Sequence, residues 1–214
     1  MYHHIRQPQS TDVRELRELS CAPETFIRHL EALQKADYQF ITFEDVAAGR
    51  ITTKSVIITI DDGYQDAYTA YQILRQRKLK AVFFVTTKYL GDNRHLSTAQ
   101  LKEMARRDME IGSHSVSHAD LTALSPERCQ KEIQESKQFL ENLLDKKIIS
   151  FCYPAGRQNA GVRRLVKDSG YLYARTTRPG FGKIDTETYT LRTFRVDDTT
   201  DAEELVRRIN YSQK

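Results

Sequence analysis

The alternation of short apolar segments with stretches of helical spacing is the feature that most constrains the fold of this chain. Residues 55–61, "SVIITID", form a near-continuous apolar run of the kind found in parallel strands that are buried on both faces. Residues 80–85, "KAVFFV", have the same character. Between the two runs, Ala67, Ala70 and Leu74 fall on one face of a helix over residues 65–78. This order of strand, helix and strand predicts a parallel α/β unit.

The same alternation continues along the chain and predicts about eight strands. They fall at residues 1–5, 38–42, 55–61, 80–85, 109–113, 148–154, 171–175 and 190–196. Helices are predicted between most of them, with start or stop signals at Ser97 with Gln100, Ser125 with Pro126, Gly170, and Thr200 with Glu203. Eight units favour an α/β barrel over a doubly wound sheet. In either fold the functional site lies at the C-terminal ends of the strands.

Length and composition narrow the class of protein further. The 214 residues fit one domain, which we place at residues 1–214. A net charge of +4, with the basic residues scattered along the chain, is too weak a bias to indicate nucleic acid as a partner. The three cysteines form no CxxC pair, and their odd number argues against a disulfide framework. No stretch approaches the ~20 apolar residues of a membrane span.

Asp61 and Asp62 stand side by side at the end of the strand predicted at 55–61. Two adjacent negative charges repel each other, and burying either is costly unless a positive charge is near. An Asp-Gly pair between apolar residues is also a hairpin signal. However, the residues after Gly63 have helical spacing, which weighs against a hairpin. The pair therefore indicates a site that uses one carboxylate for a metal ion and the other for a proton.

His114 and His118, in "HSVSH", follow the strand predicted at 109–113. Four residues apart, they would face the same side of a helical turn and could share a metal ion. The spacing alone also fits two surface histidines. Two histidines and Asp62 would leave one metal position open for water, as in hydrolytic sites, and would leave Asp61 free as a base.

At these residues the sequence resembles the polysaccharide deacetylases, also called carbohydrate esterase family 4 or the NodB-homology domain. "TIDDGY" is similar to the Thr-Phe-Asp-Asp-Gly motif of that family, and "HSVSH" is similar to its His-Ser/Thr-x-x-His motif. "FCYPAG" and "YHHI" resemble the Tyr-Pro-x-Gly and Tyr-His-x-Ile segments of the branch that acts on poly-N-acetylglucosamine-type polymers. The resemblance covers residues 2 to about 209 and implies an irregular (β/α) barrel of seven or eight strands.

The resemblance also implies a role for each candidate site residue. Asp62, His114 and His118 would bind one divalent metal ion. Zn²⁺ is the first choice, and Co²⁺ or Ni²⁺ would suit the same ligand set. Asp61 would be the general base and His3 the general acid.

The segment after the strand predicted at 148–154 would contact the substrate. The resemblance implies that the backbone N–H of Ala155, next to Tyr153 and Pro154, helps to bind the oxyanion. Tyr64, Tyr89 and Tyr153 are candidates for stacking against a sugar ring.

The choice of His3 as the acid depends on the first strand. Successive strand residues point to opposite faces, so only one of His3 and His4 can reach the site. The Tyr-His-x-Ile pattern of the family selects His3. Of the other histidines, His29 is predicted on the charged side of a helix and His95 in a polar loop.

The sequence departs from the wider family in three ways. No arginine stands near Cys152, where the family has one that steadies the catalytic aspartate; Arg192 and Arg157 could replace it, or could be surface residues. The chain has no tryptophan, so the Asp-x-x-Asp-Trp motif is missing. "LRTFRV" lacks the histidine of the Leu-x-His motif. These departures favour the Tyr-Pro-x-Gly branch over chitin or peptidoglycan deacetylases of the usual type.

The implied function is metal-dependent hydrolysis of N-acetyl groups from an N-acetylglucosamine-containing polysaccharide. The expected partner is an acetylated amino-sugar polymer or oligomer, with no obligate protein partner. Two alternatives stay open: an amide hydrolase acting on a substrate such as a cyclic imide, and a non-catalytic carbohydrate-binding relative. Relatives of this branch act on exported polymers, so we expect a piece of a longer protein with a signal or membrane anchor. A native start at Met1 would instead favour a cytoplasmic enzyme.

Overall fold

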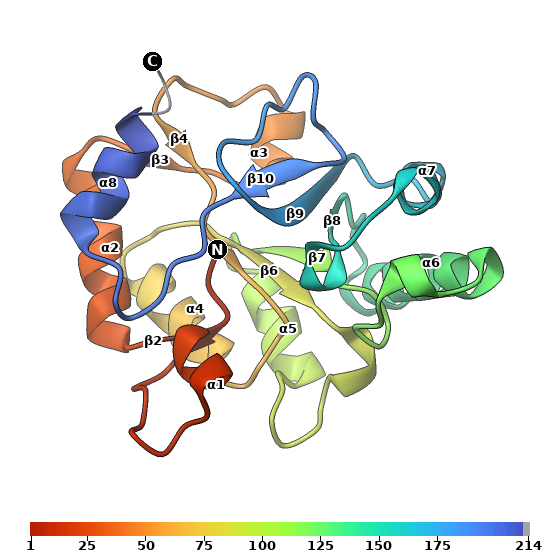
Figure 1. Ribbon diagram of the computed structural model, residues 1–214, viewed down its shortest axis with the longest axis horizontal. Helices are drawn as coiled ribbons and strands as arrows, with labels where there is room; N and C mark the ends of the chain where they lie inside the picture. The colour runs from red at the N-terminus through yellow and green to blue at the C-terminus, as the bar shows by residue number, and fades with distance from the viewer. Residues whose placement is uncertain (212–214) are drawn as a thin grey trace.

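A parallel sheet of six strands forms the centre of the computed structural model, which describes residues 1–211. The strand order is β10–β9–β8–β7–β6–β5, and every neighbouring pair is parallel. The strands are β5 Thr59–Ile60, β6 Val82–Val85, β7 Glu110–Ser113, β8 Ser150–Cys152, β9 Tyr173–Pro179 and β10 Leu191–Thr193. The sheet curls into part of a barrel with helices around its outside (Figure 1). The predicted barrel-type α/β fold is thereby confirmed; residues 212–214 of the predicted domain lie outside the described part.

Four further short strands form two small parallel sheets. They are β1 His4–Ile5 with β2 Ser20–Cys21, and β3 Gln39–Phe40 with β4 Ser55–Val56. The strand predicted at 55–61 is therefore split, because β4 pairs with β3 while β5 pairs with β6. The predicted total of about eight strands becomes ten shorter ones within residues 1–211.

The first residues of the chain fill the gap between the outer strands of the main sheet, β5 and β10. The Tyr2 carbonyl accepts the Asp61 N–H at 3.0 Å, which attaches the segment to the end of β5. The Met1 carbonyl accepts the Val196 N–H at 3.0 Å, just after β10. This pairing holds the next residue, His3, beside the C-terminal end of the sheet.

Eight α-helices connect or flank these strands within the described residues. They are α1 Arg14–Glu18, α2 Pro23–Lys35, α3 Phe43–Ala47, α4 Ala67–Gln76, α5 Thr98–Ala105, α6 Pro126–Leu144, α7 Ala160–Asp168 and α8 Ala202–Tyr211. Three short 3₁₀ turns follow β6, β7 and β8, namely η1 Thr87–Tyr89, η2 Leu121–Ala123 and η3 Pro154–Gly156. In residues 1–211, no helix combines the length and the apolar character that crossing a membrane requires.

Most of the predicted helix boundaries are confirmed. Ser97 caps α5 in a capping box with Gln100, and the Ser125 hydroxyl caps α6. The start predicted at Thr200 is wrong, because the carboxylate of the next residue, Asp201, accepts a backbone N–H of the first turn of α8 at 2.9 Å. Threonine and aspartate are both good N-cap residues, so the local sequence does not choose between them.

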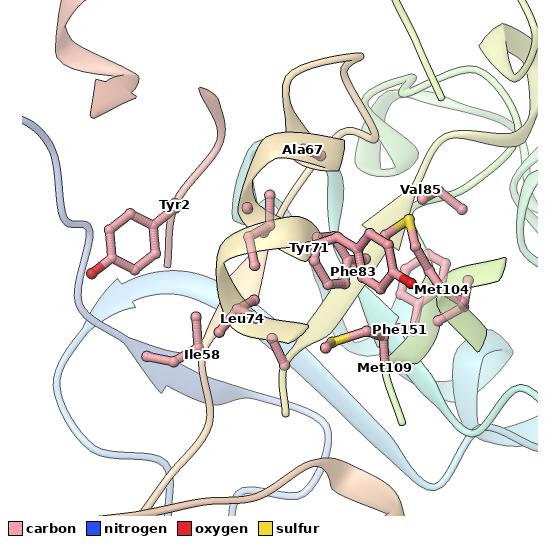
Figure 2. Close-up of a cluster of buried hydrophobic side chains, with 14 of the residues drawn as sticks. Tyr2, Ile58, Ala67, Tyr71, Leu74, Phe83, Val85, Met104, Met109 and Phe151 are labelled. Atoms are coloured by element: carbon pink, nitrogen blue, oxygen red, sulfur yellow. The ribbon is translucent and has the colours of Figure 1, made fainter. Parts of the chain in front are cut away.

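Strand β6 is buried on both faces, as its apolar run predicts. Val82, Phe83, Phe84 and Val85 are all 0% exposed. Phe83 and Val85 belong to the main core, where Figure 2 shows them near Tyr71 of α4, while Val82 and Phe84 belong to a smaller cluster of side chains. Burying each such side chain contributes about 1.5–3 kcal/mol. A one-residue slip of β6 would exchange the two sets, so packing fixes the register of this strand.

His29 of α2 is buried, which corrects its prediction as a residue on the charged side of a helix. Its exposed fraction is 0%. The Nε2–H donates to the Thr200 carbonyl at 2.7 Å, so Nδ1 accepts the Tyr2 hydroxyl at 3.2 Å. Burial lowers the pKa of His29, and the neutral ring ties α2 to the first residues and to the segment before α8.

Candidate active site

Seven of the eight predicted site residues border one cavity of about 210 Å³ at the C-terminal end of the sheet. They are His3, Asp61, Asp62, His114, His118, Tyr153 and Ala155. The eighth, Pro154, is buried in the turn between two of them. The two aspartates follow β5, His114 follows β7, and Tyr153 follows β8. The carboxyl ends of neighbouring parallel strands thus bring together residues that are far apart in the sequence.

Asp62, His114 and His118 converge on one point. Asp62 Oδ1 lies 3.2 Å from His114 Nε2 and 3.4 Å from His118 Nε2. One ligand atom from each residue lies within 4.8 Å of the other two. Ligands bound about 2.1 Å from a tetrahedral ion are about 3.4 Å apart. The spacing of the three side chains therefore fits a single divalent ion.

The hydrogen bonding of His114 also fits a metal ligand. Its Nδ1 lies 2.7 Å from the carbonyl oxygen of Cys152, which can only accept, so Nδ1 carries the proton. Nε2 faces Asp62 and, once it gives up its proton, would be the nitrogen that binds the ion. Such a second bond fixes the tautomer and the ring orientation of metal-ligating histidines. Burial alone would raise the pKa of Asp62, but the hydrogen bond and charge of His114 hold it well below its usual value.

The segment that carries the two histidines is a loop, not the helical turn expected from their spacing. Ser115 and His118 have φ values of 65° and 61°, in the left-handed region. The Ser115 hydroxyl accepts the His118 N–H at 3.0 Å, and the Ser113 hydroxyl accepts the Ser115 N–H at 3.3 Å. Serine side chains thus replace the backbone bonds of a helix. Asp62 is left-handed too, with φ 72°. Such non-glycine residues cost about 1–3 kcal/mol each, and strain of this kind gathers at functional sites.

Asp61 is 2% exposed, and its two carboxylate oxygens have different surroundings. Oδ2 accepts a hydrogen bond from Arg175 Nη2 and lies 3.7 Å from Cys152 Sγ. Oδ1 has no hydrogen-bond partner among the described residues. Burial alone would raise the pKa of Asp61, but the Arg175 guanidinium outweighs it and holds the pKa below its usual value. Asp61 is therefore an ionised carboxylate with one oxygen free to accept a proton.

Arg175 is not among the residues predicted from the sequence. The two candidate arginines do not reach Asp61, because Arg192 and Arg157 form ion pairs with other carboxylates at 3.4 and 2.6 Å. Arg175 stands on β9 directly beside Cys152 of β8. The neighbouring strand thus brings a guanidinium to the place where the wider family has its arginine. In the sequence, Arg175 is visible only as an arginine at the end of the apolar run 171–175. Its contact with Asp61 could be identified only from the order of the strands in the sheet.

His3 and His4 point to opposite sides, as expected for successive strand residues. His3 borders the cavity near Asp61 and Asp62. His4 turns away, and its Nδ1 lies 2.8 Å from the Asp66 carboxylate. Burial lowers the pKa of His3 to about 4, although the two aspartates oppose this shift. His3 is therefore neutral near pH 7 and must take up a proton before it can act as an acid.

The turn after β8 places Ala155 at the edge of the cavity. Ala155 has a left-handed φ of 51°. At Gly156, φ is 71°, and an added Cβ would lie 2.2 Å from the hydroxyl oxygen of Thr177. That hydroxyl donates to the Ala155 carbonyl at 3.3 Å. Glycine at this position and the bond from β9 together hold the turn against the sheet. The role of the Ala155 N–H in oxyanion binding stays a prediction.

Of the three tyrosines proposed as sugar platforms, Tyr153 is buried, while Tyr64 and Tyr89 are half-buried. The Tyr153 side chain is 0% exposed, and its hydroxyl donates to a backbone carbonyl at 3.1 Å, so stacking on this ring is excluded. The imidazole rings of His4 and His95 both stack against the Tyr64 ring, with centroid distances of 4.0 Å and 5.0 Å. His95, predicted in a polar loop, is buried, and its ring also stacks against Tyr89 with the centroids 5.2 Å apart. Of these rings, Tyr64 and Tyr153 border the cavity, and the others pack behind Tyr64.

Three charged residues on the cavity border were also absent from the predictions. Glu15 and Glu18 come from α1, and Arg195 follows β10. They lie in a five-residue helix and in a segment without regular structure, where no hydrophobic period marks a site. The cavity border therefore carries charged side chains in addition to the predicted Tyr64 and Tyr153.

Comparison with known proteins defines the class to which this site belongs. The family model described as polysaccharide deacetylase matches residues 48–174, more than half of the chain. A relative, YxkH of Bacillus subtilis (strain 168), whose name places it among the polysaccharide deacetylases, is 32% identical over 202 residues, which are 92% of this chain and 70% of YxkH. The chain belongs to the polysaccharide deacetylase family.

One further relative and one solved structure resemble most of this chain. The poly-beta-1,6-N-acetyl-D-glucosamine N-deacetylase of Staphylococcus aureus (strain MSSA476) is 24% identical over 199 residues, which are 80% of this chain and 69% of that protein. Among solved structures, the Streptococcus pyogenes deacetylase PplD in complex with acetate superimposes with a TM-score of 0.89. It is 27% identical, and the match covers 97% of this chain and 95% of PplD. The chain thus shares nearly the whole fold of a deacetylase.

Proposed function

We propose that this chain removes N-acetyl groups from a polymer that contains N-acetylglucosamine, by hydrolysis assisted by one divalent metal ion. The observation that carries the proposal is the unpartnered Oδ1 of Asp61 beside the convergent side chains of Asp62, His114 and His118. A metal triad alone would fit many hydrolases. A buried, ionised carboxylate with one free oxygen in the same cavity supplies the base that hydrolysis needs. The name of the S. aureus relative favours poly-N-acetylglucosamine as the substrate class.

Each residue of the cavity has a role in this proposal. Asp62, His114 and His118 would hold the ion, with Zn²⁺ as the first choice and Co²⁺ or Ni²⁺ as substitutes. When bound, the ion would lower the pKa of a water molecule and polarise the acetyl carbonyl. Asp61 accepts the proton of the attacking water at Oδ1. Arg175 holds Oδ2, which keeps the carboxylate ionised and leaves Oδ1 to accept the proton.

The amide nitrogen is a poor leaving group as an anion, so it must be protonated before acetate is released. Among the described residues that border the cavity, His3 is the one histidine besides His114 and His118, and we assign this step to it. Since His3 is neutral near pH 7, the proton that Asp61 has just accepted would pass to His3 and then to the amine. The Ala155 N–H would stabilise the developing oxyanion.

Acetate release from acetylated glucosamine oligomers tests this proposal. Metal-stripped protein, reloaded separately with Zn²⁺, Co²⁺ or Ni²⁺, should bind about one ion per chain and release acetate. Cyclic imides and peptide amides assayed in parallel distinguish a deacetylase from an amide hydrolase of other specificity. Oligomer binding without acetate release by any loaded form would contradict the proposal and indicate a non-catalytic carbohydrate-binding protein.

A further inference from the structure

Glu132 of α6 holds the loop that carries His118. Its Oε2 accepts the backbone N–H of Val116 at 2.9 Å and the backbone N–H of Ser117 at 2.8 Å. Its Oε1 accepts the Ser117 hydroxyl at 2.6 Å. One half-buried carboxylate therefore takes three donors from a single loop. Hydrogen bonds to an ionised acceptor are about twice as strong as bonds between neutral groups.

The opposite edge of the same loop is attached to the turn η1. The Ser115 carbonyl accepts the Thr87 N–H at 3.2 Å, and the Val116 carbonyl accepts the Lys88 N–H at 2.9 Å. The loop is thus held through its carbonyls on one edge and through its N–H groups on the other. Among the described residues, Glu132 is the acceptor for the N–H groups of Val116 and Ser117, so its removal would leave both without a partner.

His118 is the metal ligand that depends most on this support. Its side chain is 40% exposed, whereas that of His114 is 3% exposed. His114 directly follows β7, and its ring is fixed by the Cys152 carbonyl. The backbone of His118 is left-handed and is tied to the loop through the Ser115 hydroxyl. The position of its Nε2 therefore follows the position of the loop.

We propose that Glu132 is a positioning residue for the metal site, which sets the affinity for the ion by fixing His118 relative to Asp62 and His114. This inference rests on the metal site of the proposed function. Outer residues that orient metal ligands typically change metal affinity by 10–100-fold when they are substituted. We expect a loss in that range when Glu132 no longer reaches the loop.

Two conservative substitutions distinguish the effect of losing the hydrogen bonds to the loop from the effect of losing the negative charge of Glu132. Glu132→Asp keeps the charge but is one methylene shorter, so its carboxylate no longer reaches the loop. Glu132→Gln loses the charge but keeps the length. Its carbonyl can accept both N–H groups that now share Oε2, and its amide can donate to the Ser117 hydroxyl. Glu135→Asp is a matched control, because Glu135 is exposed on the same helix and forms no hydrogen bond or ion pair within the described residues.

The measurement is the Zn²⁺ dissociation constant of the metal-free protein, obtained by competition with a chromophoric chelator in the absence of substrate. We expect the constant to rise 10–100-fold for Glu132→Asp and to stay within about threefold of wild type for Glu132→Gln and Glu135→Asp. The visible spectrum of the Co²⁺ form should change in Glu132→Asp and be restored in Glu132→Gln.

Wild-type affinity in Glu132→Asp would overturn the inference. A larger loss in Glu132→Gln than in Glu132→Asp would also overturn it, since only the Gln variant removes the charge and this order would indicate a long-range effect of charge. A wild-type protein that binds no divalent ion would overturn the metal site itself, and the inference with it. The two failures are therefore distinguishable.

Discussion

Glu110 should make the folded protein less stable as the pH rises. It lies at the start of β7, at the end of the sheet opposite the cavity, and is 2% exposed. Its Oε1 accepts the Ser150 hydroxyl at 2.5 Å, and its Oε2 accepts the Glu44 N–H at 2.9 Å. Burial is the largest influence and raises the pKa of Glu110 from 4.5 to about 7, although these two bonds favour the charged form.

The size of the effect follows from the shift of the pKa. Because the folded pKa is higher than the unfolded one, folding takes up a proton between these values. The stabilisation by the neutral acid is complete below pH 4.5 and is lost as the pH rises through about 7. A difference of about 2.5 units (about 7 minus 4.5) corresponds to about 3.4 kcal/mol. About 2 kcal/mol of this is lost between roughly pH 5.5 and pH 8.

Glu110→Gln removes the titration and keeps the shape of the neutral side chain. Urea unfolding of the metal-free protein, with the free energy extrapolated to water, measures the result. The free energy of unfolding of the variant, relative to that of wild type, should rise by about 2 kcal/mol between about pH 5.5 and pH 8. Glu135→Gln changes an exposed residue, so its free energy of unfolding should differ from that of wild type by the same amount at every pH. A pH-independent difference between Glu110→Gln and wild type would refute the reasoning.

Three further predictions concern the candidate active site. Asp61→Asn should abolish acetate release and keep about one ion per chain in metal analysis, because a base is not a ligand; loss of the ion would mean that the two adjacent aspartates have exchanged roles. His114→Ala should lose the ion on dialysis, and a variant that retains it at wild-type affinity would exclude His114 from the ligand set. His3→Ala should reduce turnover by roughly 10²–10⁴, with metal content unchanged, whereas His4→Ala should have little effect. The loss in His3→Ala should shrink with an activated ester, whose leaving group needs little protonation, and an undiminished loss would argue against an acid role.

Features that depend on residues close in the sequence could be predicted without a structure. The apolar runs of the strands and the caps at Ser97 and Ser125 are local signals, and the structure contains them. The place of the candidate site was also predictable, because the C-terminal ends of parallel strands meet at one edge of a sheet. Asp61 and Asp62 therefore lie beside the histidines as expected.

Features that depend on distant packing could not be predicted. Arg175 and Asp61 are 114 positions apart, and no local pattern links them. Glu132 looked like any polar residue of a long helix until the fold brought the 115–118 loop against it. His29 was assigned to the charged side of its helix because periodicity shows only which face is most apolar. The segment before α8 then covers that side and buries the ring.

The contact between Arg175 and Asp61 also has a consequence for the order in which the site forms during folding. Asp62 follows β5 and His114 follows β7, with β6 between them, so these two ligands can meet once three neighbouring strands have paired. Arg175 reaches Asp61 only after β8 and β9 have joined the sheet. Contacts between residues far apart in the chain form slowly, because the entropy of loop closure must be overcome first. A refolding chain should therefore capture metal before its base is oriented, and a metal-sensitive dye should respond earlier than acetate release.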